Sequence, residues 1–451
     1  MKLRKNLSPI AFPVIFFAGV ICLGTFLLHS PFALRGQAIS WLNALFTATS
    51  ATCVTGLVVV DTGTYFSRGG QLVILGLIQL GGLGIMTFTS LAAYLWRHRI
   101  SITDNVAVGQ GLLHDPNFHL GRFLKLIFFW TMVIELSGAL LLTFFDPHGF
   151  SGFSALFHAV SAFCNAGFGL RADSLSAWRG DWGVNLVIMG LIILGGLGFS
   201  VITELQGHYL ALPRRRRHGR RLSWYSTLVI RTTLFLIVVG ALMIYLGERS
   251  GTGRELSGGT ALLTALFQSV TCRTAGFNTL EIGRMTNVAI LVMIILMFIG
   301  GAPGSCAGGI KVTTFRTLWA FLVSHLRGRE QAVVGRFAVD RNSVSSALTL
   351  LVFAVALVIF AILLLDFSEG GNIPHDQARG LFLEIVFEVV SAFGTVGLSA
   401  GLTPKLTQFG RLVIISLMFI GRLGPLVLLA SLQSLQKQEL FLRPEEKILI
   451  G

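Results

Sequence analysis

Four short segments of the sequence share one pattern of residues, and each closes around a glycine. They read FTATSATCVTGL, FHAVSAFCNAGF, FQSVTCRTAGF and FEVVSAFGTVGL, and their glycines are Gly56, Gly167, Gly276 and Gly397. Intervals of roughly 110 to 120 residues are too long for a solenoid and indicate four pseudo-equivalent modules around an axis. A backbone that points successive carbonyls at a ligand needs dihedral angles that glycine permits. Loops of this kind form the carbonyl-lined filters of cation channels.

The candidate filter consists of the last four residues up to each glycine. None of them is Asp or Glu, so selectivity would come from carbonyl dipoles, which suit a monovalent cation better than a divalent one. The alternative, that the glycines only allow close helix packing, explains one such glycine better than four in register. The predicted filter residues are Cys53, Val54, Thr55, Gly56, Cys164, Asn165, Ala166, Gly167, Arg273, Thr274, Ala275, Gly276, Gly394, Thr395, Val396 and Gly397. The cation is expected at the carbonyls of Val54, Thr55, Asn165, Ala166, Thr274, Ala275, Thr395 and Val396.

The composition places the chain in a bilayer, because 53% of its residues are hydrophobic and only 12% are charged. Apolar stretches of about 20 residues can cross a membrane. The first such stretch follows three basic residues, as in a secretory signal, but no convincing cleavage site follows it, and we interpret it as a helix. The eight predicted spans lie near Pro9–Leu28, Gln71–Leu95, Phe123–Phe145, Val184–Leu205, Thr227–Leu246, Val288–Val323, Val344–Leu365 and Leu412–Leu432.

The net charge of +14 is distributed unevenly over this topology. Acids and bases balance in the loops that hold the four segments, so the whole excess falls on the opposite side. The positive-inside rule then predicts that both termini are cytoplasmic. The basic cluster at 214–221 is interpreted as a topology determinant, with contact to anionic lipid or a partner as the alternative. Nucleic-acid binding is not expected.

The segments Ile39–Thr52, Ser151–Phe163, Ser257–Thr271 and Gln377–Phe393 are too short to cross a bilayer and end at the glycine loops. Non-helical backbone at membrane depth must line protein or a watery cavity. The predicted fold is therefore an all-α integral membrane protein with four linked helix–pore loop–helix repeats around a central pore. The repeats are placed at residues 1–98, 99–212, 213–328, where the second helix is broken, and 329–451, which includes the C-terminal tail.

A second glycine-rich feature follows each loop, at 81–84, 195–198, 300–304 and 421–425. It predicts that every second helix is weakened at one depth below the filter. In the third module it extends to GGAPGSCAGGIK, a composition that no regular helix tolerates, and we expect a flexible gate there. Arg422 lies at the same depth in the fourth module and is expected to mark the ion path. The predicted gate comprises Arg422 with Gly300, Gly301, Ala302, Pro303, Gly304, Ser305, Cys306, Ala307, Gly308, Gly309, Ile310 and Lys311.

Further ionisable residues fall within membrane depth. Glu135, Glu384 and Glu388 are expected to serve buried hydrogen bonds, with ion coupling or cation attraction as the alternative. Arg273 is expected to support loop carbonyls, because a pore-lining cation would repel the permeant ion. The five cysteines show no metal-like CxxC pair and are expected to be buried thiols.

These motifs resemble those of the Trk/Ktr/HKT superfamily of potassium transporters, most closely the KtrB-type membrane subunit of bacterial Ktr systems. The resemblance rests on VTGL at 54–57, NAGF at 165–168, RTAGFNT at 273–279, GTVGLSAG at 394–401, the gate segment, Arg422 and PEEKILIG at 444–451. It implies potassium uptake across the bacterial cytoplasmic membrane, a homodimer, and regulation by a cytosolic KtrA-like nucleotide-binding ring. Gly56 favours potassium, since sodium-selective members often have serine there.

The resemblance implies no covalent cofactor: potassium is the substrate, sodium stays open as a second ion, and nucleotide acts only through the partner. Two alternatives remain, namely sodium-selective uptake by the same fold and sodium-coupled transport of another solute. The latter would show two inverted repeats rather than four parallel ones. No HExxH motif and no pair of aspartates occurs at membrane depth, so an enzyme is not expected. Channel-like flux and sodium-coupled flux are not distinguished by any residue.

Overall fold

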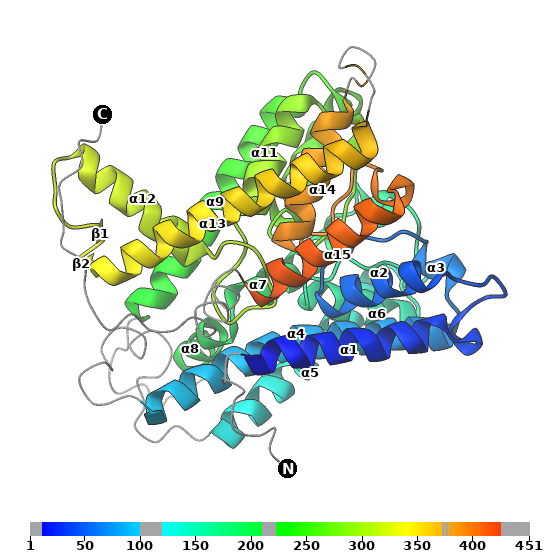
Figure 1. Cartoon of the computed structure of the whole chain (residues 1–451), viewed down its shortest axis with the longest axis horizontal. Helices are drawn as coiled ribbons and strands as arrows, with labels where there is room; N and C mark the ends of the chain where they lie inside the picture. Colours follow the sequence, from blue (N-terminus) through cyan, green and yellow to red (C-terminus); the bar gives the residue numbers. More distant parts are fainter. Residues whose placement is uncertain are drawn as a thin grey trace.

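The computed structural model describes residues 11–99, 120–209, 222–371, 374, 378 and 380–424. Helices dominate this part of the chain, which contains one two-stranded antiparallel sheet (Figure 1). The basic cluster at 214–221 and the PEEKILIG ending lie outside the described residues. The helices and strands are α1 Ala11–His29, α2 Trp41–Thr52, α3 Thr62–Tyr65, α4 Arg68–Arg99, α5 Leu120–Phe145, α6 Gly152–Phe163, α7 Trp182–Leu197, α8 Phe199–Tyr209, α9 Trp224–Glu248, α10 Gly258–Thr271, α11 Asn287–Phe298, α12 Val312–Leu326, β1 Val333–Val334, β2 Phe337–Ala338, α13 Arg341–Leu365, α14 Leu381–Gly394 and α15 Gln408–Leu423.

The four short helices α2, α6, α10 and α14 correspond to the four segments that were expected to be too short to cross. Serine side chains fix the start of two of them. The side-chain oxygen of Ser40 accepts the backbone N–H of Asn43, and that of Ser257 accepts the N–H of Thr260. Such caps satisfy N–H groups that have no partner inside the helix. Each short helix ends at the loop that carries a candidate filter glycine.

The helices close into a ring through contacts between successive modules. The helix after each loop packs against the short helix of the next module: α4 on α6, α7 on α10, and α11 on α14. Helix α15 then packs on α2, which joins the last module to the first (Figure 1). The cyclic arrangement expected from the fourfold repeat is therefore present.

The outer surface of the ring is apolar, as a lipid-facing surface must be. Large side chains on α5, α9 and α13 are exposed, including Phe144 at 76%, Leu234 at 59% and Val352 at 67%. Among the described residues, three helices are long and apolar enough to cross a membrane, at Lys125–Phe145, Trp224–Glu248 and Arg341–Gly370. The helices Trp182–Leu197 and Phe199–Gly207 are long and apolar enough to cross a membrane only if they are counted as one bent span. Eight spans were expected, with the Val288–Val323 span broken, and by this test of length and composition the described residues contain three, or four with the bent pair.

The expected weakening of every second helix is wrong for the first module, where α4 runs through Gly81 and on to Arg99. In the other three modules the helix is interrupted at this depth. Helices α7 and α8 meet at Gly198 with a bend of 103°, α11 and α12 are separate helices, and α15 ends at Leu423, before Gly424 with φ of 84°. The Val288–Val323 span is accordingly two helices separated by the candidate gate.

The first glycine of the feature allows close packing in three of the modules. A Cβ atom at Gly81 would lie 1.9 Å from the carbonyl oxygen of Thr52, the last residue of α2. A Cβ at Gly195 would lie 1.8 Å from the oxygen of Phe163, and one at Gly421 would lie 2.0 Å from that of Phe393. The glycines therefore let the second helix of the first, second and fourth modules approach the end of its own short helix.

Replacement of Gly195 by alanine should destabilise the protein, because the new methyl group would collide with the Phe163 carbonyl. Gly190 lies on the same helix, and a Cβ added there would meet nothing within 4 Å, so Gly190→Ala is the matched control. We expect the thermal midpoint of the purified protein to fall by several degrees or more for Gly195→Ala. Gly190→Ala should leave the thermal midpoint unchanged or raise it, since alanine in a helix is more stable than glycine by about 1 kcal/mol. Equal midpoints would contradict the packing role.

Candidate cation filter and gate

The four loops share an unusual backbone conformation. The residue two positions before each glycine has a left-handed backbone: φ is 55° at Val54, 60° at Asn165, 71° at Thr274 and 50° at Thr395. Within the described part of the chain, Ser174 alone joins them as a non-glycine residue with positive φ. The glycines themselves have φ values of 96°, 67°, 81° and 88°. Such strained positions persist where the surrounding structure fixes them and are concentrated at functional sites.

Hydrogen bonds to the short helices orient these loops. The N–H of Thr55 donates to the carbonyl of Ser50 at 2.8 Å, that of Ala166 to Ser161 at 2.7 Å, and that of Val396 to Ser391 at 2.8 Å. In the third module the N–H of Ala275 donates to Thr271 at 2.9 Å. The donors therefore point back into the short helices. The side chains of Ser50 and Ser391 also accept the N–H groups of Gly56 and Gly397, each at 3.1 Å.

The loop carbonyls have a different environment from the loop N–H groups. No described residue donates a hydrogen bond to the carbonyl oxygens of the two residues before each glycine, namely Val54, Thr55, Asn165, Ala166, Thr274, Ala275, Thr395 and Val396. Buried backbone acceptors are normally satisfied. Eight acceptors at repeated positions are suited to bind a cation that has lost its water. No group of three or more His, Cys, Asp or Glu residues in the described ranges could hold a metal ion, and the loop carbonyls are the candidate ligands.

The four glycines form a closed ring of close contacts. A Cβ at Gly56 would lie 2.5 Å from the carbonyl oxygen of Ala166, and one at Gly167 would lie 2.8 Å from that of Ala275. The series continues from Gly276 to the Val396 oxygen at 2.6 Å, and from Gly397 back to the Thr55 oxygen at 1.9 Å. The structure therefore brings all four predicted loops together. A side chain on any of the glycines would displace a neighbouring carbonyl.

The segment between α11 and α12 lies directly beside this ring. A Cβ at Gly308 would lie 2.1 Å from the Thr395 hydroxyl, and one at Gly309 would lie 3.3 Å from the Cα of Gly394. The segment is not helical, as the sequence predicts. It is nevertheless attached to the second module, because the N–H groups of Ala302 and Cys306 donate to the carbonyls of Gly196 and Gly195 at 2.9 and 3.2 Å.

Arg422 of the fourth module contacts both the third and the first modules. Its side chain is 2% exposed, and its guanidinium donates to the carbonyl of Cys306 in the gate segment and, at 2.7 Å, to that of Gly81 on α4. Neither of the two ion pairs among the described residues involves it. Backbone dipoles therefore stabilise the buried charge, and the guanidinium holds the gate segment against the first and fourth modules.

Arg273 supports the start of the same segment. Its Nη2 donates to the carbonyl of Gly300 at 3.1 Å, and only 6% of the residue is exposed. This contact agrees with the expected supporting role. The residue with the left-handed backbone in this loop is Thr274, the next residue along the chain.

The buried glutamates have hydrogen-bonding partners that the sequence did not identify. Glu135 accepts the side-chain N–H of Gln79 at 3.0 Å and lies 3.8 Å from the Cys164 thiol. Gln79 was missed, although an amide two residues before Gly81 in an apolar run is a signal. Glu388 accepts the hydroxyls of Ser399, at 2.9 Å, and Thr403. These contacts match the structural interpretation of both carboxyl groups.

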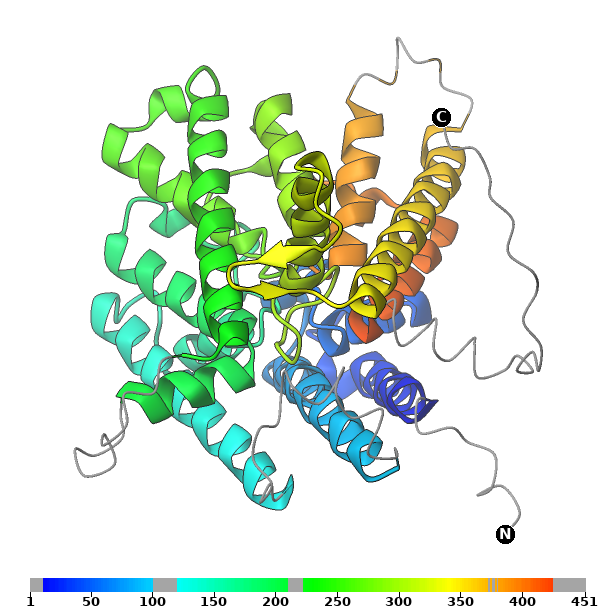
Figure 2. The same cartoon turned by 90° about the vertical axis from the view of Figure 1, so that its left-hand side faces the viewer.

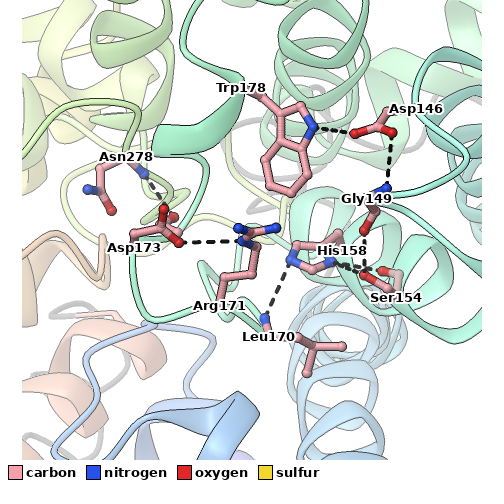
Figure 3. A network of polar contacts seen from close by, with 10 residues as sticks. Asp146, Gly149, Ser154, His158, Leu170, Arg171, Asp173, Trp178 and Asn278 are labelled. Atoms are coloured by element: carbon pink, nitrogen blue, oxygen red, sulfur yellow. Dashed lines mark hydrogen bonds and ion pairs between the residues drawn. The ribbon is translucent and has the colours of Figure 1, made fainter.

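A polar network supports the outer side of the second loop (Figure 3). His158 on α6 contacts the carbonyl of Ser154 through Nδ1 at 2.8 Å, and its Nε2 accepts the backbone N–H of Leu170 at 3.4 Å. Because a carbonyl only accepts and an N–H only donates, these two contacts select the neutral ring with its proton on Nδ1. His158 thereby links the short helix to the chain that leaves the loop.

The same network includes the connection from α5. The Trp178 indole N–H donates to Asp146 at 2.6 Å, and the Arg171 guanidinium lies 4.9 Å from the centre of the Trp178 ring (Figure 3). The N–H groups of Gly149 and Trp178 hold the pKa of Asp146 below its usual value. The sequence did not single out these residues, because their contacts join positions far apart in the chain.

The chain matches the family model "TrkH: Cation transport protein" over residues 18–439. It is 40% identical to "Ktr system potassium uptake protein B" of Bacillus subtilis, covering 92% of this chain and 91% of that protein. It is 35% identical to "Potassium/sodium uptake protein NtpJ" of Enterococcus hirae, covering 100% and 99%. The crystal structure of the potassium transporter TrkH from Vibrio parahaemolyticus superimposes with a TM-score of 0.74 at 18% identity, over 97% of this chain and 88% of that one.

These similarities agree with the arrangement of helices and loops. The solved structure shares the fold, and the family model covers all four loops and Arg422. The family is one of transport proteins, which confirms that the chain is not an enzyme. The chain belongs to the TrkH family of membrane-embedded cation transport proteins and is similar to the KtrB type within the Trk/Ktr superfamily.

Proposed function

We propose that this protein takes up potassium across the cytoplasmic membrane through the ring of four glycine loops. The observation that carries the proposal is the closed ring itself, in which eight loop carbonyls accept no hydrogen bond from the described residues. Potassium loses its hydration shell more easily than a small divalent cation, and carbonyl rings replace that shell. The relatives named as potassium uptake proteins support this choice of ion.

The segment from Gly300 to Lys311 is proposed as the gate, with Arg422 as its clamp. It lies against Thr395 and Gly394 of the filter and is held by the Arg422 guanidinium. Movement of this segment would require Arg422 to release the Cys306 carbonyl. In this proposal the pathway opens when the hydrogen bond between Arg422 and the Cys306 carbonyl breaks.

The wider assembly is proposed from the charge distribution and from the relatives. Both termini face the cytoplasm, where the excess of basic residues lies. Two copies form a homodimer, and a cytosolic KtrA-like nucleotide-binding ring regulates them, in keeping with a relative named as one protein of a "Ktr system". Nucleotide would then act only through that partner.

Sodium is the second candidate ion, because one relative is named as a potassium/sodium uptake protein. Gly56 argues for potassium, since its lack of a side chain leaves the Ala166 carbonyl undisturbed. Sodium-coupled transport of another solute fits less well, because the four modules form one cyclic ring rather than two inverted halves.

Replacement of Gly56 by serine tests the filter. The Cβ would come within 2.5 Å of the Ala166 carbonyl, so the carbonyl spacing should change and potassium should lose its advantage. We expect the potassium-to-sodium selectivity of flux into liposomes to fall by about tenfold or more, a change of about 1.4 kcal/mol. Gly76→Ser is the matched control, because Gly76 lies on α4 in open space. Unchanged selectivity in Gly56→Ser would refute the filter assignment.

Two serines behind the filter provide a finer test. Ser391→Ala removes the acceptor of the Gly397 N–H, whereas the hydroxyl of the equivalent Ser161 has no hydrogen-bond partner among the described residues. A net hydrogen bond contributes about 0.5–1.5 kcal/mol, so selectivity should fall by roughly two- to tenfold in Ser391→Ala. Ser161→Ala should behave as wild type in the same flux assay. If both variants lose selectivity equally, the hydrogen bond to the glycine is not the cause.

Arg422→Ala should increase basal potassium flux, because it removes the hydrogen bond that holds the gate segment. The basal flux of Arg422→Lys should lie between those of wild type and Arg422→Ala, since lysine keeps the charge but lacks the planar guanidinium that reaches two carbonyls. Deletion of Ser305–Gly308 should raise flux as well. If Arg422 acts through this segment, adding Arg422→Ala to the deletion changes nothing more.

Liposomes with and without the cytosolic ring provide the measurement. The response of flux to the ring should shrink in Arg422→Ala. Fully additive effects of the deletion and the substitution, or an undiminished response to the ring, would place the gate elsewhere.

A further inference from the structure

A cavity of about 410 Å³ lies outside the ring of loops, between α9, α12 and the β1–β2 hairpin. Figure 2 shows the hairpin beside α9. Trp224 and Val334 both line the cavity, and the Trp224 indole N–H donates to the carbonyl of Val334 at 3.2 Å. The cavity lies near the N-terminal end of α9, whereas the C-terminal end of that helix leads towards α10 and the filter.

Two arginines line this cavity, and neither has an anion from the described part of the chain beside it. Arg231 is two turns inside α9, at a depth of about 10 Å from the first residue of the helix. Arg316 lies in the first turns of α12. Neither forms an ion pair or a side-chain hydrogen bond with any residue in the described ranges. A guanidinium inside a membrane-facing helix is costly unless an anion or water compensates its charge.

The rest of the lining is aromatic and apolar. Phe315 and Trp319 stack along α12 with ring centres 6.3 Å apart, and Trp319 is 50% exposed. Phe235 extends the wall along α9 and is 57% exposed on the apolar outer surface. Tryptophan is enriched where a protein meets the membrane interface. The cavity thus combines two positive charges that have no partner among the described residues with an apolar wall that continues onto the lipid-facing surface.

We propose that this cavity binds an anionic phospholipid. Arg231 and Arg316 bind the phosphate oxygens, and an acyl chain follows Phe235 and Phe315. Guanidinium groups form strong paired hydrogen bonds to phosphate, and basic pockets between transmembrane helices suit such headgroups. The proposal depends on the membrane fold but not on the filter or the transported ion, so it can fail independently of the proposed function.

The position of this site gives it a route to the gate. Helix α12 begins at Val312, directly after the gate segment ends at Lys311, and Arg316 lies about one turn further along. A lipid held by Arg316 therefore contacts the helix from which the gate segment emerges. Lipid composition would bias the position of that helix without any contact with the filter.

Native mass spectrometry of the full-length purified protein, titrated with phosphatidylglycerol or phosphatidylcholine, tests the proposal. Wild type should bind one phosphatidylglycerol per chain more tightly than phosphatidylcholine. Arg231→Gln combined with Arg316→Gln should weaken phosphatidylglycerol binding by about tenfold or more, because both charge-assisted contacts are lost. Arg327→Gln, at an exposed arginine that ends α12 outside the cavity, should bind like wild type.

Equal phosphatidylglycerol binding by wild type and the double variant would overturn the proposal. Equally tight binding of the two lipids by wild type would do the same. A change in oligomeric mass without a change in lipid affinity would assign the face to a second copy of the chain, and displacement by millimolar inorganic phosphate would assign it to a soluble anion. If the glutamine variants do not fold, the Arg231→Lys and Arg316→Lys pair, which keeps the charge, should give intermediate affinity, and wild-type affinity there would overturn the guanidinium contacts.

Discussion

The direction of the loop hydrogen bonds determines the architecture of the candidate site. In every module a loop N–H donates back into the short helix, to Ser50, Ser161, Thr271 or Ser391. With the donors used in this way, the carbonyls of the same residues are left without partners in the described part of the chain. The left-handed backbone at Val54 and its three equivalents makes this alternation sterically feasible. Left-handed backbone of this kind at non-glycine residues is concentrated at functional sites.

Glycine serves two separate purposes in this fold. At Gly56, Gly167, Gly276 and Gly397 it provides positive φ and brings one loop against the carbonyl of the next. At Gly81 it lies in a continuous helix and allows close approach to the end of α2. The two kinds of glycine act on the same short helix. Helix α4 packs against the end of α2 at Gly81, and α2 also accepts the hydrogen bond that orients the first loop. Packing around the ring is thus coupled to carbonyl geometry inside it.

The gate segment combines an irregular backbone with specific attachment. Its glycines and proline prevent a helix, and its N–H groups bind the carbonyls of Gly195 and Gly196. Arg422 adds a contact from the fourth module, and Arg273 adds one from the third. Carbonyl dipoles rather than acids hold both guanidinium groups. A segment held by such exchangeable contacts can change position without breaking an ion pair, which would be costly at this depth.

The sequence alone determined the medium, the fourfold repeat, the short helices and the loops. These features are local: an apolar stretch, a helix too short to cross and a glycine are all readable along the chain. Arg273 was expected to support loop carbonyls, and its hydrogen bond to the Gly300 carbonyl agrees with that role. The glycine-rich feature at 81–84 was misread as a helix break, since composition does not distinguish flexibility from close packing.

Only the tertiary structure decided what lies across from each residue. The closure of α15 on α2, the clamp from Arg422 to Cys306 and Gly81, and the pairing of Gln79 with Glu135 join residues from different modules. The cavity between α9 and α12 likewise depends on two helices that are separated in the chain by α10 and α11. Sequence periodicity specifies which face of a helix is apolar, but partners across the ring are set by how the four modules pack, which no local pattern encodes.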